Sequence, residues 1–215
     1  MRHSVIKIAL PVFLLLASTA RADTAREQLD RFAQGLESLR AEFSQVVIST
    51  DNTVQDRSEG QVWLLQPDRF RWSYGGDFPE QVVGDGERIW IYDEMLEQVT
   101  VKPHDDDSLD SPLALLTQPN RIDEAFEVRE VGSWDQAQLL ELRSRSGDKE
   151  FERFLLGFDN DEPVLIVIED AFGLRTEIRF SSLERNPKLD AALFTFTPPE
   201  GTDVIGALPG DDESR

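Results

Sequence analysis

The sequence predicts a mainly β protein with a few helices, an α+β fold built on one large antiparallel sheet. Three observations predict it: polar and apolar residues alternate along most of the chain, tight-turn residues separate these stretches, and a helical apolar stripe precedes them. The clearest turn signal is Asp85-Gly86. A flat sheet of about twelve strands would expose its edges and one face, so we expect this sheet to curl or close.

The N-terminal residues 1–22 have the features of a secretory signal peptide. Basic residues precede an apolar run that is too short to span a bilayer, and Ala20 and Ala22 supply small side chains before Asp23. We expect cleavage near Ala22/Asp23, export, and a single mature domain over 23–215 with an acidic flexible tail at about 206–215. The chain has no cysteine, so neither a lipid-attachment site nor a disulfide is expected.

The mature chain is strongly acidic. The full sequence has 22 Lys and Arg against 42 Asp and Glu, and removing residues 1–22 takes away three basic residues, which leaves a net charge of −23. Nucleic acids and anionic lipid head groups repel such a surface. The charge keeps a protein that handles an apolar ligand in solution, but a general adaptation to solubility explains it equally well.

The first element of the mature chain is expected to be a helix over residues 24–39. Its apolar side chains recur at spacings of three and four and form one stripe, which continues into the next segment: Leu29, Phe32, Leu36, Leu39 and Phe43. A helix of this kind has to lie on an apolar surface, and the predicted sheet provides one.

After this helix, the alternation predicts strands almost to the end of the chain. The expected ranges are about 42–50, 57–65, 68–74, 79–84, 87–93, 96–101, 126–131, 138–144, 151–158, 164–170, 173–183 and 193–197. In the strand at 68–74 the aromatic rings share one face. In the strand at 87–93 isoleucines alternate with Trp90 and Tyr92, so both faces are apolar. Either protein covers this region on both sides, or one side faces an apolar ligand.

A short helix is expected within residues 109–120, in the middle of the β-rich region. Ser111 can cap it, Pro112 can be its first residue, and three leucines follow. A leucine-rich helix in this position is either a lid over an apolar space or a connection buried against the end of the sheet. The sequence leaves both interpretations open.

The residues that support catalysis or metal binding are scarce. The mature chain has one histidine, His104, no cysteine, and no serine in a Gly-x-Ser-x-Gly turn. The run His104-Asp-Asp-Asp contains four potential metal ligands, and residues 159–162 resemble part of a calcium loop, but a solvated acidic loop and a β-turn explain them better. We therefore expect no catalytic residues, no metal and no cofactor.

Five segments of the mature chain form a distinctive combination. They are PDRFRWSY, QVVGDGERIWIYDEMLEQVTV, SPLALL, FDNDEPV and FGLRTEIRFSSLERNPKLDAALFTFTPPEGTDVI. Together they resemble the LolA family of periplasmic outer-membrane lipoprotein carriers, over essentially the whole mature chain. The resemblance implies an unclosed, strongly curved antiparallel β-barrel of about eleven strands, with an N-terminal helix and a short helical lid.

The same resemblance implies a function in the periplasm. A carrier of this kind accepts lipoproteins released from the inner membrane by an ABC transporter of the LolCDE type, shields their acyl chains in an apolar cavity, and delivers them to an outer-membrane receptor of the LolB type. We expect a monomer with acylated lipoproteins as cargo and no nucleic acid partner. A periplasmic lipid- or lipoprotein-sensing regulator of similar fold, or a lipid hydrolase, are the alternatives.

The expected cavity and lid residues are large apolar side chains on the strands and the short helix: Trp63, Phe70, Trp72, Trp90, Leu113, Leu116, Phe154, Leu156, Ile166, Ile178 and Phe180. The chain departs from the family at one position. LolA proteins commonly have an Arg-Pro pair before the aromatic strand, whose arginine resembles a latch that hydrogen-bonds the lid, and here the pair is Gln66-Pro67. Gln66 and Arg69 are the latch candidates, unless Gln66 is simply an exposed loop residue.

Overall fold

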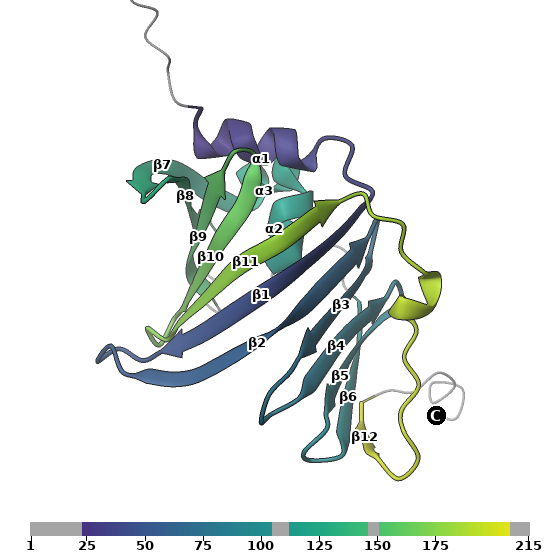
Figure 1. Cartoon of the computed structure of the whole chain (residues 1–215). Coiled ribbons are helices and arrows are strands. Elements are labelled where there is room, and N and C mark those ends of the chain that lie inside the picture. Colours follow the sequence, from purple (N-terminus) through teal and green to yellow (C-terminus); the bar gives the residue numbers. More distant parts are fainter. Residues whose placement is uncertain (1–22, 105–111, 146–150, 207–215) are drawn as a thin grey trace, which may run out of the picture.

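The computed structural model describes residues 23–104, 112–145 and 151–206 (Figure 1). The predicted signal peptide, residues 1–22, and nearly all of the predicted tail lie outside the described residues. No helix in the described part of the chain is long and apolar enough to cross a membrane.

Within the described residues, twelve strands form one sheet, in the order β12-β6-β5-β4-β3-β2-β1-β11-β10-β9-β8-β7. Their bounds are β1 (Ser38–Ile48), β2 (Val54–Leu65), β3 (Arg69–Tyr74), β4 (Glu80–Asp85), β5 (Arg88–Asp93), β6 (Gln98–Pro103), β7 (Phe126–Trp134), β8 (Ala137–Ser144), β9 (Phe151–Asp159), β10 (Glu162–Asp170), β11 (Arg175–Arg185) and β12 (Asp203–Ile205). All neighbours are antiparallel except β12 and β6, which run parallel. The prediction of a wholly antiparallel sheet is therefore wrong at this edge, where the C-terminal segment returns along β6.

The C-terminal segment also differs from the prediction of a strand at 193–197. The chain instead forms a short 3-10 helix, η1 (Ala191–Phe194), and reaches the sheet only at β12. The Asp190 side chain accepts a hydrogen bond from the backbone N–H of Ala192 at 3.0 Å, which starts the helical turn. Local capping by Asp190 thus overrides the alternation of phenylalanine and threonine on which the prediction rested.

Helix α1 (Ala25–Ala33) is shorter than the predicted helix over 24–39. It begins with a capping box, in which Thr24 accepts from the backbone N–H of Glu27 and the Glu27 carboxylate accepts from that of Thr24. It ends before Gly35, whose φ of 68° is incompatible with a right-handed helix. The apolar stripe continues to be buried beyond this point, but on β1 rather than on the helix.

The sheet is neither closed nor rolled into a barrel. Its edge strands are β12 and β7, and they do not pair with each other. The prediction of an unclosed sheet is confirmed, whereas that of a strongly curved barrel is wrong. The reason is the position of the helices: α1 lies across β8, β9 and β10, and α2 (Pro112–Thr117) and α3 (Pro119–Ala125) lie beside it over the inner face (Figure 1). Helices that cover an apolar face make it unnecessary for the sheet to close upon itself.

The two faces of the sheet bury different groups of residues. On the inner face, side chains of β1–β3 and β7–β11 form one large hydrophobic core with helices α1, α2 and α3. On the outer face, β4–β6 carry a small cluster of Val83, Trp90, Val99 and Val101, against which Phe196 and Val204 of the C-terminal segment pack. Strands β4 and β5 are thus covered on one side by protein, and their other side faces the space described next.

Candidate ligand-binding cavity

A cavity of about 450 Å³ lies between α2 and the inner face of β3–β6. This volume is in the range of ordinary small-ligand sites. Its wall residues come from β2–β6, the turn after β2, α2 and β11: Leu64, Pro67, Asp68, Arg69, Phe70, Trp72, Tyr74, Val82, Ile89, Ile91, Lys102, Pro103, His104, Pro112, Leu113, Ala114, Thr117, Gln118 and Ile178. Most of these side chains are apolar, so the cavity suits a hydrocarbon ligand better than a polar one.

The floor of the cavity is aromatic because of the alternation along β3. Phe70, Trp72 and Tyr74 project from the same face of this strand, as the sequence predicts. Behind them, the ring of Phe43 on β1 meets Trp72 edge-on at 4.8 Å and Tyr74 edge-on at 5.0 Å between centroids. These contacts fix the rings in place, so the floor is a preformed surface.

Gly84 on β4 makes room for the ring of Phe70. A Cβ atom at position 84 would lie only 2.4 Å from the nearest atom of that ring. The two residues are paired across β3 and β4, so the phenylalanine ring lies over the backbone of its partner. The glycine is therefore needed for packing, which is a usual role of glycine inside a strand.

The roof of the cavity is α2, which has an apolar contact on both sides. Leu113 lines the cavity and is also 2% exposed, while Leu115 and Leu116 are fully buried in the main core. Ser111, the predicted cap, lies outside the described residues. The helix therefore separates the cavity from the core beneath α1, and both the lid and the buried-connection interpretation describe part of its position.

Polar groups are few on the cavity floor. The Tyr74 hydroxyl lies 3.4 Å from Oε1 of Gln45, to which it donates. Burial, and then the nearby Glu80 carboxylate, raises the pKa of Tyr74 to about 12, so the hydroxyl is neutral. The charged wall residues Asp68, Arg69 and Lys102 belong to the turn before β3, to the start of β3 and to the end of β6.

The structure brings only some of the predicted site residues together at the cavity. Five of them line it: Arg69, Phe70, Trp72, Leu113 and Ile178. A second group lies in the main core without lining the cavity: Leu116, Phe154, Leu156, Ile166 and the partly buried Phe180, whose ring is 6.3 Å from that of Trp72. Within the second group, Phe154, Leu156 and Ile166 lie under α1 because β9 and β10 pass beneath that helix.

Trp63 and Trp90 lie on the other face of the sheet. Trp90 belongs to the outer cluster, and its indole N–H donates to the Asp85 carboxylate at 2.7 Å. Trp63 alternates with the inward-facing Val62 and Leu64 on β2. Neither residue lines the cavity, and a strand that is apolar on both faces does not reveal which face is the inner one.

Neither latch candidate holds the roof in the described part of the chain. Gln66 does not line the cavity, and Arg69 lines it from the start of β3; no described side-chain hydrogen bond joins either residue to α2 or α3. Among the cavity residues that sequence reasoning missed are Val82, Ile89 and Ile91. Their signal was the alternation in β4 and β5, which was visible but did not identify the inner face.

Metal binding finds no support among the described residues. Within residues 23–104, 112–145 and 151–206, no group of three or more His, Asp or Glu side chains gathers in a way that could hold an ion. The acidic residues 105–107 of the run after His104 lie outside the described residues. Residues 159–162 form the tight turn between β9 and β10, as the sequence predicted.

Comparison with known proteins gives a consistent result. The model of the family described as "Outer membrane lipoprotein carrier protein LolA" matches residues 34–197. Proteins named outer-membrane lipoprotein carrier protein are similar over nearly the whole chain. That of Dechloromonas aromatica is 39% identical over 96% of this chain and 100% of its own, and that of Nitrosospira multiformis is 40% identical over 90% and 93%. Among solved structures, an uncharacterized conserved protein from Thermus thermophilus shares the fold, with a TM-score of 0.53 and 18% identity over 84% of this chain and 98% of its own.

Proposed function

The chain belongs to the LolA family of outer-membrane lipoprotein carrier proteins, and from this premise we propose that the cavity beneath α2 shelters the acyl chains of a lipoprotein cargo. As a member of this family, the protein is a carrier in outer-membrane biogenesis and not an enzyme. The observation that carries the proposal is the preformed cavity with an aromatic floor and a leucine-rich helical roof.

The energetics favour α2 as a lid that opens for the cargo. Moving α2 away exposes three buried leucines, and each contributes roughly 1.5 to 3 kcal/mol when buried. Each acyl CH₂ group that leaves water contributes about 0.8 kcal/mol, so a long chain easily offsets this loss. Acyl chains therefore replace the contacts of the leucines, and the closed lid competes with the cargo. This competition keeps the affinity low enough for the cargo to be released.

Membership of the family supports a proposed route for the cargo. The mature protein works in the periplasm after cleavage near Ala22/Asp23, accepts lipoproteins from an inner-membrane ABC transporter of the LolCDE type, and delivers them to an outer-membrane receptor of the LolB type. The acidic surface supports this route, since it keeps the loaded carrier from adhering to anionic lipid head groups.

A synthetic tripalmitoylated lipopeptide tests the proposal. The mature protein is expected to form a soluble complex with it in size-exclusion chromatography, and to form none with the same peptide without acyl chains. Ile89→Glu places a charge on the cavity wall and is expected to abolish the complex. Ile205→Glu, at a side chain that is 48% exposed on β12, is the matched control and should behave as wild type. Equal binding by both variants would refute this location for the acyl chains.

A further inference from the structure

Helices α2 and α3 form a continuous unit beside the cavity. Only Gln118 separates Thr117, the last residue of α2, from Pro119, the first residue of α3. Ile122 of α3 is fully buried in the main core, and α3 also contacts α1. Whatever holds α3 in place therefore also determines where α2 lies.

Arg26 on α1 forms hydrogen bonds with one side of α3. Its Nη1 and Nη2 donate to the two carboxylate oxygens of Asp123 at 2.7 and 2.8 Å, and Nη2 also donates to the carbonyl oxygen of Pro119 at 3.2 Å. Pro119 and Asp123 are four residues apart and so lie on the same side of the helix. Asp30, one turn later on α1, accepts from Nε at 3.0 Å and orients the guanidinium group.

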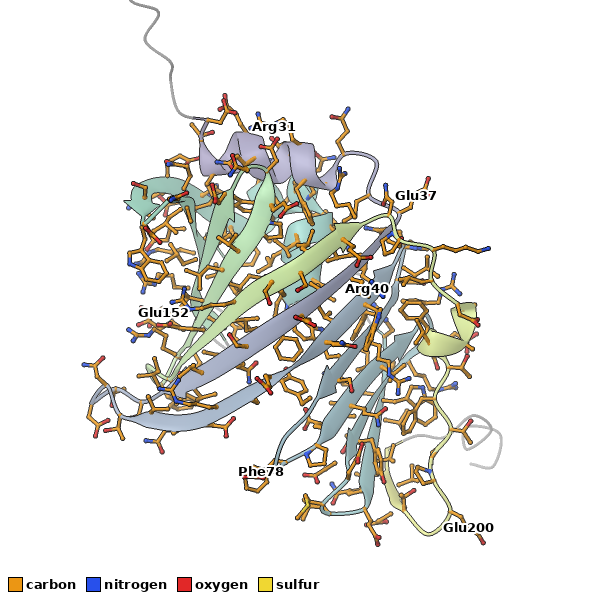
Figure 2. The ribbon with its side chains drawn as sticks, viewed as in Figure 1. Arg31, Glu37, Arg40, Phe78, Glu152 and Glu200 are labelled. Atoms are coloured by element: carbon orange, nitrogen blue, oxygen red, sulfur yellow. The ribbon has the colours of Figure 1, made fainter. Side chains whose placement is uncertain are left out.

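Helix α1 is itself fixed to the sheet, so Arg26 projects from a stable support. The Glu130 carboxylate on β7 accepts from the backbone N–H groups of Ala25 at 3.1 Å and Arg26 at 2.9 Å. At the other end, Arg31 donates to Asp161 in the turn between β9 and β10, with a shortest distance of 2.7 Å. Figure 2 shows Arg31 on this helix.

A hollow separates the helices where Arg26 crosses between them. It has a volume of about 490 Å³ and is open to solvent, and its wall includes Arg26 and Asp30 of α1 together with Thr117, Pro119 and Asn120. The main core also joins α1 to α2 and α3 through Leu29, Leu115 and Ile122, and the bridge of Arg26 adds a polar connection at the edge of this core, where the hollow opens to solvent.

We infer that Arg26 is the positioning residue of the lid: by tying α3 to α1 through Asp123 and Pro119, it holds α2 over the cavity. The inference rests on the proposed function of the cavity and of α2 as its cover. It replaces Gln66 and Arg69 as the residue that sets the balance between closed and open lid. Loss of the bridge shifts this balance toward the open form and makes the cavity more accessible.

The test is the substitution Arg26→Gln, read out with the neutral apolar dye N-phenyl-1-naphthylamine and the cargo-free mature protein. We expect the dye to bind two- to fivefold more tightly, and the amide hydrogens of α2 to exchange faster. The effect is small because the Asp123 side chain is 57% exposed, and a bridge open to solvent contributes little. Arg26→Lys keeps the charge but loses the two parallel hydrogen bonds to Asp123. Its dye affinity should lie between those of wild type and Arg26→Gln.

Arg31→Gln is the matched control. It removes an arginine from the same helix and breaks ion pairs with Asp23 and Asp161, but neither partner belongs to α2 or α3. It should lower stability to a similar degree and leave the dye affinity and the exchange of α2 unchanged. Asp123→Asn removes the bridge from the other side and should reproduce Arg26→Gln, and the double variant should add nothing further.

Two failures can be told apart. If the wild-type protein binds no tripalmitoylated lipopeptide, the proposed function of the cavity falls. If it binds the lipopeptide, but Arg26→Gln and Asp123→Asn match Arg31→Gln in dye affinity and in the exchange of α2, the bridge is only a surface ion pair and this inference is overturned. Full additivity of Arg26→Gln and Asp123→Asn in dye affinity would overturn it as well.

Discussion

The two halves of the inner face differ in how they are covered, although both are built from the same alternation of residues. Under α1, the side chains of β8–β10 are packed to completion, and Phe154 and Ile166 are 2% and 0% exposed. Over β4 and β5 the corresponding side chains, such as Val82 and Ile89, are only partly buried and border the cavity. Alternation along the strands therefore produces an apolar face, and the helices that lie over it determine whether this face becomes core or the wall of a cavity.

The open half obtains its order from the opposite face. Val83 and Trp90 pack against Phe196 and Val204 of the C-terminal segment, and the Asp85 side chain ties the turn between β4 and β5. The face of β4 and β5 that lines the cavity has few packing partners, so packing on the opposite face keeps these strands in position. The C-terminal segment is thus part of what preserves the cavity.

The largest effect is expected from Phe154→Ala, in the packed half. The ring is buried and meets Phe126 edge-on at 5.6 Å, so its loss leaves a cavity in the core and should lower the free energy of unfolding by about 3 to 5 kcal/mol. Urea denaturation measures this loss in the free energy of unfolding. A loss below about 1 kcal/mol would mean that this half is also loosely filled, and the contrast between the halves would disappear.

A smaller effect is expected from Gly84→Val, at the boundary with the cavity. The new side chain displaces the ring of Phe70 from its place over β4, which should lower the free energy of unfolding by about 1 to 3 kcal/mol and weaken binding of the apolar dye. Gly76→Val is not a suitable comparison because the φ of Gly76 is 88°. Gly75→Val is the control and should leave dye binding intact, because an added Cβ there comes no closer than 3.8 Å to a neighbouring atom.

Ile89→Ala, in the open half, should separate stability from binding. Because its side chain borders a space that exists already, its truncation removes little packing and should lower the free energy of unfolding by about 1 kcal/mol or less. The affinity for the lipopeptide should fall, since the acyl chain loses part of its wall. A loss as large as that of Phe154→Ala would show that Ile89 is an ordinary core residue.

The smallest effect is expected from Asp85→Asn and concerns pH. Burial works against ionisation of Asp85, but hydrogen bonds from the Trp90 indole and from the backbone N–H groups of Glu87 and Arg88 outweigh it and hold the pKa of Asp85 below its usual value. A lowered pKa stabilises the fold above the pKa of the unfolded chain, and this contribution is lost as the pH falls through the folded value. Wild type should therefore lose slightly more stability than Asp85→Asn between pH 7 and strongly acidic pH, as thermal melting at a series of pH values will measure. Identical pH profiles of the two proteins would show that ionised Asp85 does not stabilise the turn between β4 and β5.

Much of the fold and part of the site could be predicted from the sequence. The alternation along the chain located eleven of the twelve strands of the described residues. The spacing of Phe70, Trp72 and Tyr74 placed them on one face, because successive side chains of a strand point to opposite faces. Helix α1 was found from its apolar stripe, although its end was set by Gly35. The segments that resemble the family identified it correctly, as the match of the family model to residues 34–197 shows.

Only the tertiary structure decided which face of each doubly apolar strand is the inner one. Trp90 and Ile89 are neighbours on β5, yet the first supports the sheet from behind and the second lines the cavity. It also decided that Phe154 belongs to the core, because α1 lies over β9, and that Arg26 bridges α1 to α3. The physical reason is the same in each case. Local periodicity shows which side chains share a face of a strand. What covers that face depends on elements that are distant in sequence and adjacent only in the folded chain.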